Sequence, residues 1–297
     1  MSETGPSVSV IIPTFNRPAQ LRECVLALSR SSLPFSRFEV VVVDDGSAVP
    51  LDRALSDIPG GLDIRLIRQA NAGPAAARNA GAAAARAPFL AFTDDDCQPA
   101  STWLQALLRA HLAAPDAALG GRTINALSEN VFSDTSQLLL QYMYDRLNRD
   151  PGAAAFFASN NFAVPREGYL ALGGFDRGFP RAAGEDRDFC ARWSGSGRAL
   201  AYCPEAQVLH AHRLDLVTFL RQHFAYGRGA HRFRTRAAPA QGGAIRFERL
   251  DFYTGIFAAP FSTPGARKTG RMLALLAASQ AANTAGFVWE MLADRRG

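Results

Sequence analysis

Three consecutive carboxylates, Asp94-Asp95-Asp96, follow the apolar run at residues 88–93. Neighbouring carboxylates repel one another, so a fold keeps three of them at a strand end only where cations or hydrogen-bond donors compensate their charge. Hard oxygen ligands suit Mg²⁺ or Mn²⁺, which commonly stay partly hydrated and share their remaining positions with substrate phosphates. The triplet therefore predicts a divalent metal and a nucleoside diphosphate. The alternative is an acidic helix start, in which Asp96 or Ser101 caps the helix that follows.

The elements that must position the triplet alternate between strands and helices. Four apolar runs predict strands, and the patterns between them predict helices at 18–28 and 73–86. Strands that are apolar on both faces and alternate with helices form parallel sheets buried on both sides. Such sheets bind ligands at the carboxyl ends of their strands. The predicted strands are 7–12, 38–43, 62–67 and 89–93, and a polar motif follows each of them.

The second half of the chain changes character. It predicts neither an internal repeat nor a linker long enough to separate independent domains. The expected elements are a strand at 155–164, a turn at Gly173-Gly174-Phe175-Asp176, a helix at 185–193, short strands at 199–202 and 206–209, and a helix from Leu216.

The composition is that of an ordinary globular chain. The 297 residues are 48% hydrophobic and 20% charged, enough for one large core or two modest ones. The net charge of +5 comes almost entirely from arginine, with Lys268 as the only lysine; together with the many alanines this indicates coding bias, so we infer no partner from it. Four scattered cysteines without a CxxC pair, and no charged-then-apolar leader, favour free thiols in a reducing cytoplasm.

Five ordered motifs point to a known family. They are VSVIIPTFNR at 8–17, VVVDDGS at 41–47, NAGPAAARN at 71–79, TDDD at 93–96 and GEDRD at 184–188. With this set the chain resembles a family 2 glycosyltransferase of the GT-A fold. The resemblance implies an α/β fold with a Rossmann-like, mainly parallel sheet flanked by helices, and a C-terminal helical extension. The expected domains are a catalytic domain at 1–212, with a nucleotide-binding half at about 1–100 and an acceptor half at about 101–212, and the extension at 213–297.

The resemblance implies transfer of a single sugar from a nucleoside-diphosphate sugar to an acceptor hydroxyl. An aspartate of the second motif, Asp44 or Asp45, would accept a hydrogen bond from the base. A carboxylate suits the imide N–H of uracil or thymine, so UDP- or dTDP-linked donors are favoured. The alternative for these residues is an Asx turn. The residues expected to bind the nucleotide sugar are Pro13, Thr14, Asn16, Arg17, Asp44, Asp45, Asn71, Gly73, Arg78, Asp94 and Asp95.

The third motif opens a helix. Gly73 and Pro74 leave the first N–H groups of that helix accessible to a ligand. Arg78, about one turn further along, could reach the phosphates or the base. The alternative is that Arg78 lies on a solvated face of the helix.

The metal, Mn²⁺ or Mg²⁺, would bind the first and third members of the triplet by family usage, with Asp96 as the primary ligand and Asp94 beside it. His210-Ala211-His212 follows a predicted strand, and alternating residues of a strand point to opposite faces, so at most one of the two histidines should face the site. We expect His210 to be a metal ligand or a donor to the leaving diphosphate. The alternative is a structural histidine.

Glu185-Asp186 is a second acidic pair. In inverting members of the family a carboxylate at this motif is the general base, and Asp186 is the matching residue, with Glu185 beside it. Desolvation and repulsion by a neighbouring carboxylate can hold such a group near a useful pKa. The alternative is an N-cap of the following helix.

Arg192-Trp193 superficially resembles the Gln-x-x-Arg-Trp signature of processive synthases, but it lacks the glutamine and lies too close to Asp186, which favours single-sugar transfer.

Arginines are interleaved with aromatic residues between 213 and 236. This stretch matches no RNA or DNA module, so we expect no nucleic-acid partner. A basic amphipathic helix on anionic lipid near a lipid-linked or polymeric acceptor fits the pattern, and so does a core-packing helix with a solvated arginine face. The stretch 272–292 contains several polar residues and predicts a packed or interfacial helix. The expected location is cytoplasmic, with peripheral contact to the inner face of the membrane through 213–297 as an option.

Two other classes of protein fit parts of the sequence. A sugar-1-phosphate nucleotidyltransferase needs a glycine-rich, basic loop after the first strand, where this chain has Pro13-Thr14-Phe15-Asn16. A non-catalytic nucleotide-sugar-binding subunit would lack the metal and base carboxylates, which are all present. We therefore expect an enzyme that acts on a carbohydrate, lipid-linked or small-molecule acceptor. Ser159-Asn160-Asn161 and the turn at 173–176 are expected to shape the acceptor side.

Overall fold

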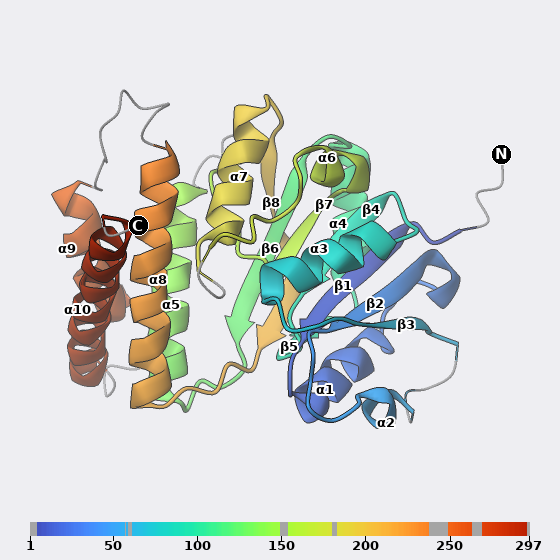
Figure 1. Cartoon of the computed structure of the whole chain (residues 1–297), viewed down its shortest axis with the longest axis horizontal. Helices are drawn as coiled ribbons and strands as arrows, with labels where there is room; N and C mark the ends of the chain where they lie inside the picture. The colour runs from blue at the N-terminus through green and yellow to red at the C-terminus, as the bar shows by residue number, and fades with distance from the viewer. Residues whose placement is uncertain are drawn as a thin grey trace. The chain divides into compact units, whose positions relative to one another are not determined.

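The computed structural model of the chain describes residues 5–56, 58, 61–148, 154–179, 183–237, 249–262 and 269–295 (Figure 1). The chain divides into two compact units. The sheet unit consists of residues 1–124, 148–177 and 186–211, and the helical unit of residues 125–147, 178–185 and 212–297. The helical unit thus takes two segments from the expected acceptor half, and the expected domain boundary at residue 212 stays a prediction.

The N-terminal half of the sheet is parallel, as the alternation of apolar runs and helices predicted. Its strands are β1 (Val8–Thr14), β2 (Phe38–Asp44), β3 (Asp63–Arg68) and β4 (Phe89–Thr93). β1 pairs in parallel with β2 and β4, and β2 pairs in parallel with β3. Every residue of β1, β2 and β4 is buried, which explains why these strands are apolar on both faces.

The other half of the sheet is antiparallel, so the complete sheet is mixed, with the order β3-β2-β1-β4-β7-β6-β8-β5. Its strands are β5 (Cys97–Pro99), β6 (Ala118–Asn125), β7 (Asn161–Pro165) and β8 (Leu200–His210). The expected strand at 155–164 begins only at Asn161. The two short strands expected at 199–202 and 206–209 are one strand, β8: Pro204 is exposed within it, and a proline is compatible with extended backbone where its missing N–H is not needed by a neighbour.

Helices pack on the sheet within this unit. They are α1 (Pro18–Leu28), the short α2 (Asp52–Leu55), α3 (Pro74–Ala84), α4 (Trp103–Ala113), α6 (Arg166–Ala171) and α7 (Glu185–Gly195), and a 3₁₀ turn, η1 (Phe35–Arg37), leads into β2. One hydrophobic cluster joins Ile12 of β1, Leu21 of α1 and Trp103 of α4, all completely buried. The core therefore lies against the same strands whose carboxyl ends carry the polar motifs.

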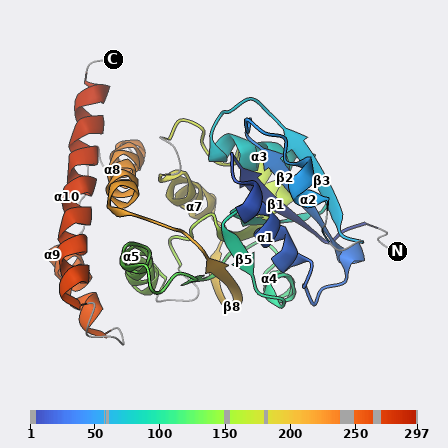
Figure 2. The same ribbon diagram turned by 90° about the horizontal axis from the view of Figure 1, so that it is seen from below.

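The helical unit contains α5 (Val131–Leu147), α8 (Leu216–Ala237), α9 (Leu250–Ala258), the 3₁₀ turn η3 (Ala259–Ser262) and α10 (Thr269–Asp294) (Figure 2). α8 and α10 pack closely because glycines lie where they meet. A Cβ atom on Gly227 would lie 1.8 Å from the Asn283 carbonyl oxygen, and one on Gly286 would lie 1.9 Å from that of Phe224. Buried Glu290 of α10 accepts a hydrogen bond from Arg228 Nε of α8 at 2.6 Å.

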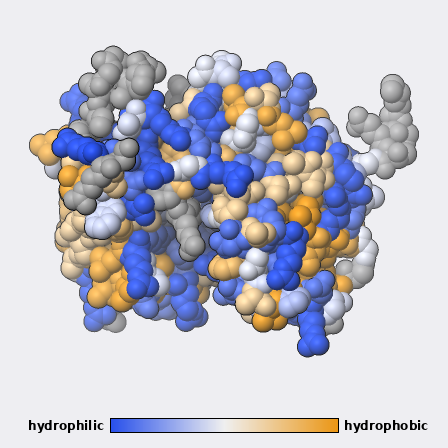
Figure 3. Space-filling model, viewed as in Figure 1, coloured by the Kyte–Doolittle hydropathy of each residue, from blue (hydrophilic) through white to orange (hydrophobic). Residues whose placement is uncertain are grey.

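Hydrophilic and hydrophobic side chains are interspersed on the face of the molecule seen in Figure 3. Among the described residues, no helix combines the length and the apolar character needed to cross a membrane. The four cysteines all lie in the described residues; each is a free thiol and is buried.

Candidate functional site

The register of the strands brings the polar motifs together within the sheet unit. In the β1–β2 ladder Thr14 lies opposite Asp44, and the N–H of Asp45 continues the pairing by donating to the Thr14 carbonyl at 2.9 Å. β4 runs parallel to β1 and ends immediately before Asp94. β8 pairs with β5 so that Cys97 lies opposite His210. The triplet, the second motif and His210 are therefore neighbours because of backbone pairing alone.

Each carboxylate of the triplet has a cationic partner in the protein. Asp94 Oδ1 pairs with Arg78 Nη2 at 2.6 Å. Arg17 Nη1 bridges Asp95 Oδ1 at 3.1 Å and Asp96 Oδ2 at 3.0 Å. The capping alternative is wrong, because β5 separates the triplet from α4, whose N-cap position is Thr102 and has no side-chain cap.

Burial has the largest effect on the pKa of Asp95. It raises the pKa of Asp95 to about 6, aided by repulsion from Asp96 and Asp94 and opposed by Arg17 and by the hydrogen bond that Thr14 Oγ1 donates at 2.8 Å. Burial lowers the pKa of His210, but its hydrogen bond with Asp96 and the charges of Asp96 and Asp94 outweigh this, so that the pKa is raised overall.

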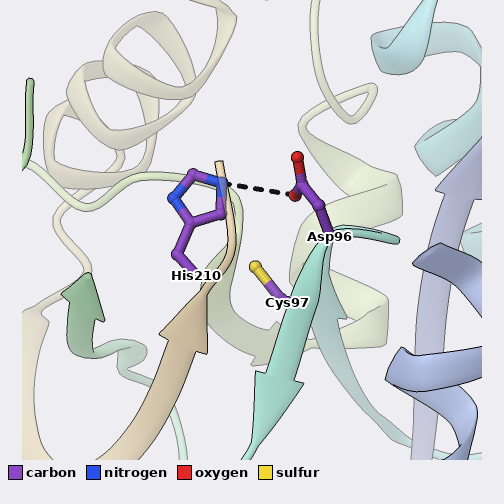
Figure 4. A group of neighbouring side chains, drawn as sticks. All are labelled: Asp96, Cys97 and His210. Carbon is purple, nitrogen blue, oxygen red and sulfur yellow. Dashed lines mark ion pairs between the residues drawn. The ribbon is translucent and has the colours of Figure 1, made fainter. Parts of the chain in front are cut away.

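Asp96, Cys97 and His210 form a group whose possible ligand atoms lie within 4.8 Å of one another (Figure 4). His210 Nε2 lies 3.2 Å from Asp96 Oδ1. Two ligand atoms that bind one ion at about 2.1 Å, with a right angle between the two bonds, lie about 3 Å apart. The distance between Asp96 Oδ1 and His210 Nε2 therefore fits a divalent metal. Cys97 fits less well, since burial raises the pKa of its thiol well above the usual value and a protonated thiol is a poor ligand.

Both aspartates of the second motif are buried and engaged. Asp44 Oδ1 accepts a hydrogen bond from the Ser47 N–H at 2.8 Å, which is the kind of turn contact given above as the alternative to base binding, and Asp44 Oδ2 lies 3.7 Å from Arg68 Nε. Asp45 uses both of its oxygens to hold the loop before α3, including the N–H of Gly73 at 2.8 Å. Asn71 ties the same loop back by donating to the Asp45 carbonyl at 2.9 Å.

The loop after β1 is tied to the loop after β2. The Asn16 N–H donates to Ser47 Oγ at 2.8 Å, and Asn16 Oδ1 accepts from the Ala48 N–H at 2.8 Å. Asn16 has a φ of +56°, in the left-handed region that asparagine tolerates better than most residues. Pro13 is buried in β1 beside this loop. The structure thus gives Asn16 a positional role, and nucleotide contacts by Pro13 and Asn16 stay predictions.

Arg78 is buried, with only 3% of its side chain exposed, so the solvated-face alternative is wrong. Its guanidinium lies over the ring of Phe175, 5.8 Å from the centroid. Its charge also opposes the rise in the pKa of Asp186 that burial causes. Arg78 therefore acts electrostatically on both Asp94 and Asp186.

Asp186 lies in the first turn of α7 and is half-buried; Glu185, at the start of α7, is fully buried. Burial raises the pKa of Asp186, and hydrogen bonds from the N–H groups of Arg187, at 2.8 Å, and Ser159 oppose the rise together with the charge of Arg78. The Ser159 N–H thus contacts the candidate base, and the expected role of Ser159 on the acceptor side stays a prediction.

Sequence reasoning missed the residues that hold the turn whose Phe175 ring packs against Arg78. Asn79 and Tyr169 hydrogen-bond to the turn that carries Phe175, and Arg192 donates to the same turn. The available signal was the Gly173-Gly174 pair, because adjacent glycines are typical of a turn, and in the structure their φ angles are +77° and +68°. Trp193 is completely buried and donates to the Ala199 carbonyl, a structural role.

Comparisons with known proteins identify the family of the chain. Residues 9–172 match the model of glycosyl transferase family 2, and residues 93–291 match that of glycosyl transferase family group 2. The chain therefore belongs to glycosyl transferase family 2, as its motifs indicated. It is 33% identical over 258 residues to the pre-mycofactocin glycosyltransferase of Mycobacterium tuberculosis, covering 82% of this chain and 52% of that protein. It is 28% identical over 234 residues to the validoxylamine A glucosyltransferase of Streptomyces hygroscopicus, covering 69% of this chain and 56% of that protein. The chain thus spans about half the length of these relatives.

Solved structures confirm the GT-A fold. The mannosyltransferase PcManGT from Pyrobaculum calidifontis, in complex with GDP-Man and Mn²⁺, superposes with a TM-score of 0.61 at 20% identity, covering 95% of this chain and 76% of that one. S. aureus TarS in complex with UDP-GlcNAc superposes with a TM-score of 0.54 at 15% identity, covering 98% of this chain and 92% of that one.

Proposed function

We propose that the protein transfers a single sugar from a nucleoside-diphosphate sugar to an acceptor hydroxyl, with inversion at the anomeric carbon. The acceptor oxygen attacks the anomeric carbon, the bond to the diphosphate oxygen breaks, and the acceptor proton passes to a carboxylate. One observation carries this proposal. Buried Arg78 pairs with Asp94 and its charge also acts on Asp186, so the triplet and a second carboxylate belong to one electrostatic cluster.

Asp186 is the proposed general base. Because burial raises its pKa, it holds a proton more readily than an ordinary carboxylate, while the N–H donors and Arg78 keep the charged form accessible. A base whose pKa lies closer to the working pH transfers protons more effectively. Glu185, the buried residue before it, is a proposed further member of the site.

A divalent metal is proposed to bind Asp96 and His210, with Asp94 nearby. The Mn²⁺ in the PcManGT complex supports this, and an imidazole ligand favours Mn²⁺ over Mg²⁺, which prefers oxygen ligands. When bound, the metal would offset the charge that develops on the departing diphosphate. Arg17 and Arg78 supply further positive charge beside the carboxylates.

Asp44 is proposed as the acceptor for the base and Asp45 as the anchor of the donor loop. The basis is a hydrogen-bond count: three donors already occupy the Asp45 carboxylate, whereas within the described part of the chain Asp44 Oδ2 has only Arg68 at 3.7 Å. An acceptor at this position favours uracil or thymine, hence UDP- or dTDP-linked donors. The remaining predicted donor residues, Thr14 and Asn71 among them, would frame the same pocket.

Binding and turnover test these assignments. Calorimetry with UDP, dTDP and GDP should show pyrimidine nucleotides binding in the presence of Mn²⁺ and releasing on addition of EDTA; equally tight binding after chelation excludes the metal role. Turnover should be screened with UDP-glucose, UDP-N-acetylglucosamine, dTDP-glucose and GDP-mannose against carbohydrate, lipid-linked and small-molecule acceptors. Asp186→Asn should leave UDP binding within about twofold and lower transfer by about a hundredfold or more. Wild-type turnover by that variant excludes Asp186 as the base.

We further propose that the helical unit contacts an anionic membrane on its cytoplasmic side. Trp289, Val288 and Leu292 of α10 are exposed apolar side chains, and Arg221 of α8 is an exposed cation. Apolar residues that insert at the headgroup level and cations near anionic lipid are the two parts of a peripheral membrane contact.

A further inference from the structure

Two helices of the sheet unit carry the groups that the proposed reaction uses on opposite sides of the bond that breaks. α3 carries Arg78, beside the triplet, and α7 carries Asp186. The turn at residues 172–175 is hydrogen-bonded to both helices. The hydrogen bonds to this turn come from neither Arg78 nor Asp186: α3 bonds to it through Asn79 and α7 through Arg192.

On the α3 side, Asn79 grips the backbone of Phe175. Asn79 Oδ1 accepts from the Phe175 N–H at 2.9 Å, and Asn79 Nδ2 donates to the Phe175 carbonyl at 2.7 Å. Asn79 Oδ1 also accepts from the Tyr169 hydroxyl at 2.6 Å. Because an amide accepts at one end and donates at the other, these bonds fix both the position and the direction of the turn. Gly174 makes this possible, since a Cβ atom there would lie 2.4 Å from Asn79 Oδ1.

On the α7 side, Arg192 grips the same turn with a rigid fork. Its Nη1 donates to the Leu172 carbonyl and its Nη2 to the Gly174 carbonyl, each at 2.8 Å. Its Nε donates to Asp188 at 2.7 Å, which holds the guanidinium plane in place. A planar group with three bonds leaves little freedom between α7 and the turn.

The turn also delivers a side chain to Arg78. The ring of Phe175 is almost completely buried and packs against Arg78 of α3, and its centroid lies 5.2 Å from that of Phe189 of α7. The same four-residue turn is therefore bonded to each helix through its backbone and packed against each through one ring.

We propose that Asn79 and Arg192 are positioning residues, which set the separation of Arg78 and Asp186 by bracing α3 and α7 against the turn at 172–175. This inference rests on the proposed function, in which Arg78 lies beside the departing diphosphate and Asp186 takes the acceptor proton. Neither residue touches the reacting atoms. Their effect on the rate comes from geometry, because a misplacement of about 1 Å between reacting groups can lower a rate by about a hundredfold.

Two conservative variants weaken the hydrogen bonds by which Asn79 and Arg192 hold the turn at 172–175, without removing either side chain. Asn79→Asp keeps the size of the side chain and the bonds it accepts, but turns a carboxylate oxygen toward the Phe175 carbonyl. Arg192→Lys keeps the charge, but a single ammonium cannot reproduce the fork. We expect kcat to fall about ten- to hundredfold in each, measured with whichever sugar nucleotide of the panel the wild type turns over. The affinity for UDP with Mn²⁺ should change by less than about twofold.

Matched controls make the same chemical changes elsewhere. Asn130 also accepts from backbone N–H groups and donates to a carbonyl, that of Leu214, within the helical unit. Arg198 lies over the ring of Trp193, 5.1 Å from its centroid. Asn130→Asp and Arg198→Lys should therefore leave kcat unchanged within about twofold.

A double-mutant cycle separates positioning from simple destabilisation. If Asn79 acts by placing Asp186, Asn79→Asp should lower kcat by less than about twofold in an Asp186→Asn background. If the two variants lower kcat independently, so that their effects multiply, the proposed positioning role is wrong. It is also wrong if Asn79→Asp changes only the affinity for UDP. Wild-type turnover by Asp186→Asn alone instead overturns the proposed base, so the two failures are distinguishable.

Discussion

Replacing Asp45 with asparagine tests which of the two adjacent aspartates contacts the base. Asp45 Oδ1 accepts from Gln69 Nε2 at 2.7 Å and from the Ala72 N–H at 2.9 Å, and Oδ2 accepts from the Gly73 N–H at 2.8 Å. An asparagine oxygen can keep the first two bonds, but its NH₂ group then meets the Gly73 N–H, donor against donor. A hydrogen bond to a charged group contributes about 1.5–3 kcal/mol, so we expect the free energy of unfolding to fall by about 2–3 kcal/mol.

The matched variant is Asp44→Asn. The bond from the Ser47 N–H survives in it, because the asparagine oxygen can accept it, so the free energy of unfolding should change by less than about 1 kcal/mol. Its affinity for UDP should fall about ten- to hundredfold, since the imide N–H loses a charged acceptor. Urea unfolding and calorimetry with UDP and Mn²⁺ measure both quantities. A loss of UDP affinity in Asp45→Asn equal to that in Asp44→Asn, with normal unfolding, would refute the assignment.

The remaining predictions concern stability, the metal and the membrane. Glu39 is completely buried, and although burial raises its pKa, hydrogen bonds from Ser9 and Arg86 and the charge of Arg86 hold that pKa below its usual value. Glu39→Gln should therefore lower the free energy of unfolding at pH 7 by about 3 kcal/mol. Measured by urea unfolding, the difference from wild type should shrink as the pH falls through the pKa of the folded carboxyl. A difference that does not vary with pH contradicts this prediction. In calorimetry, His210→Ala should reduce by about tenfold the gain in UDP affinity that Mn²⁺ produces, while the weak binding of UDP without metal stays unchanged. An unaltered Mn²⁺ titration would exclude His210 as a metal ligand. The helical unit should bind anionic vesicles at low salt, with each arginine near the surface contributing about 1 kcal/mol to the binding free energy. Trp289→Ala should weaken co-sedimentation with these vesicles. Failure of the wild type to sediment at low salt would exclude the proposed membrane contact.

The parallel half of the fold could be read from the sequence because its signals are local. Apolar runs such as 38–43 are buried on both faces, so nothing polar interrupts them, and the motifs follow at the strand ends where parallel sheets bind ligands. The antiparallel half carries no such signal. β7 begins at Asn161, whose side chain is completely buried and accepts from Trp103 Nε1 at 2.8 Å, a partner 58 residues away that no local pattern reveals.

The charge balance of the triplet shows the same limit. Three adjacent carboxylates predict compensation, and a metal was the natural candidate, but the sequence does not say which arginines come close. The structure supplies Arg17 from the loop after β1 and Arg78 from α3. The compensation is therefore partly built into the protein, and a metal would be needed for the diphosphate rather than for keeping the carboxylates folded. Among so many arginines, only tertiary structure distinguishes these two from solvated ones.

The many alanines of α3 have a structural consequence that composition alone conceals. Small residues let this helix lie close to the sheet: Ala77 and Ala82 are completely buried, and a Cβ atom on Gly81 would lie 2.5 Å from the Ile11 side chain of β1. Successive residues of a helix are rotated by about 100°, so the adjacent Arg78 and Asn79 face different neighbours. Arg78 thereby reaches Asp94 while Asn79 reaches the turn that carries Phe175. A bulkier helix would hold both side chains further from the strand ends. The alanines, which the sequence alone attributed to coding bias, therefore allow one helix to contact both Asp94 and the turn at 172–175.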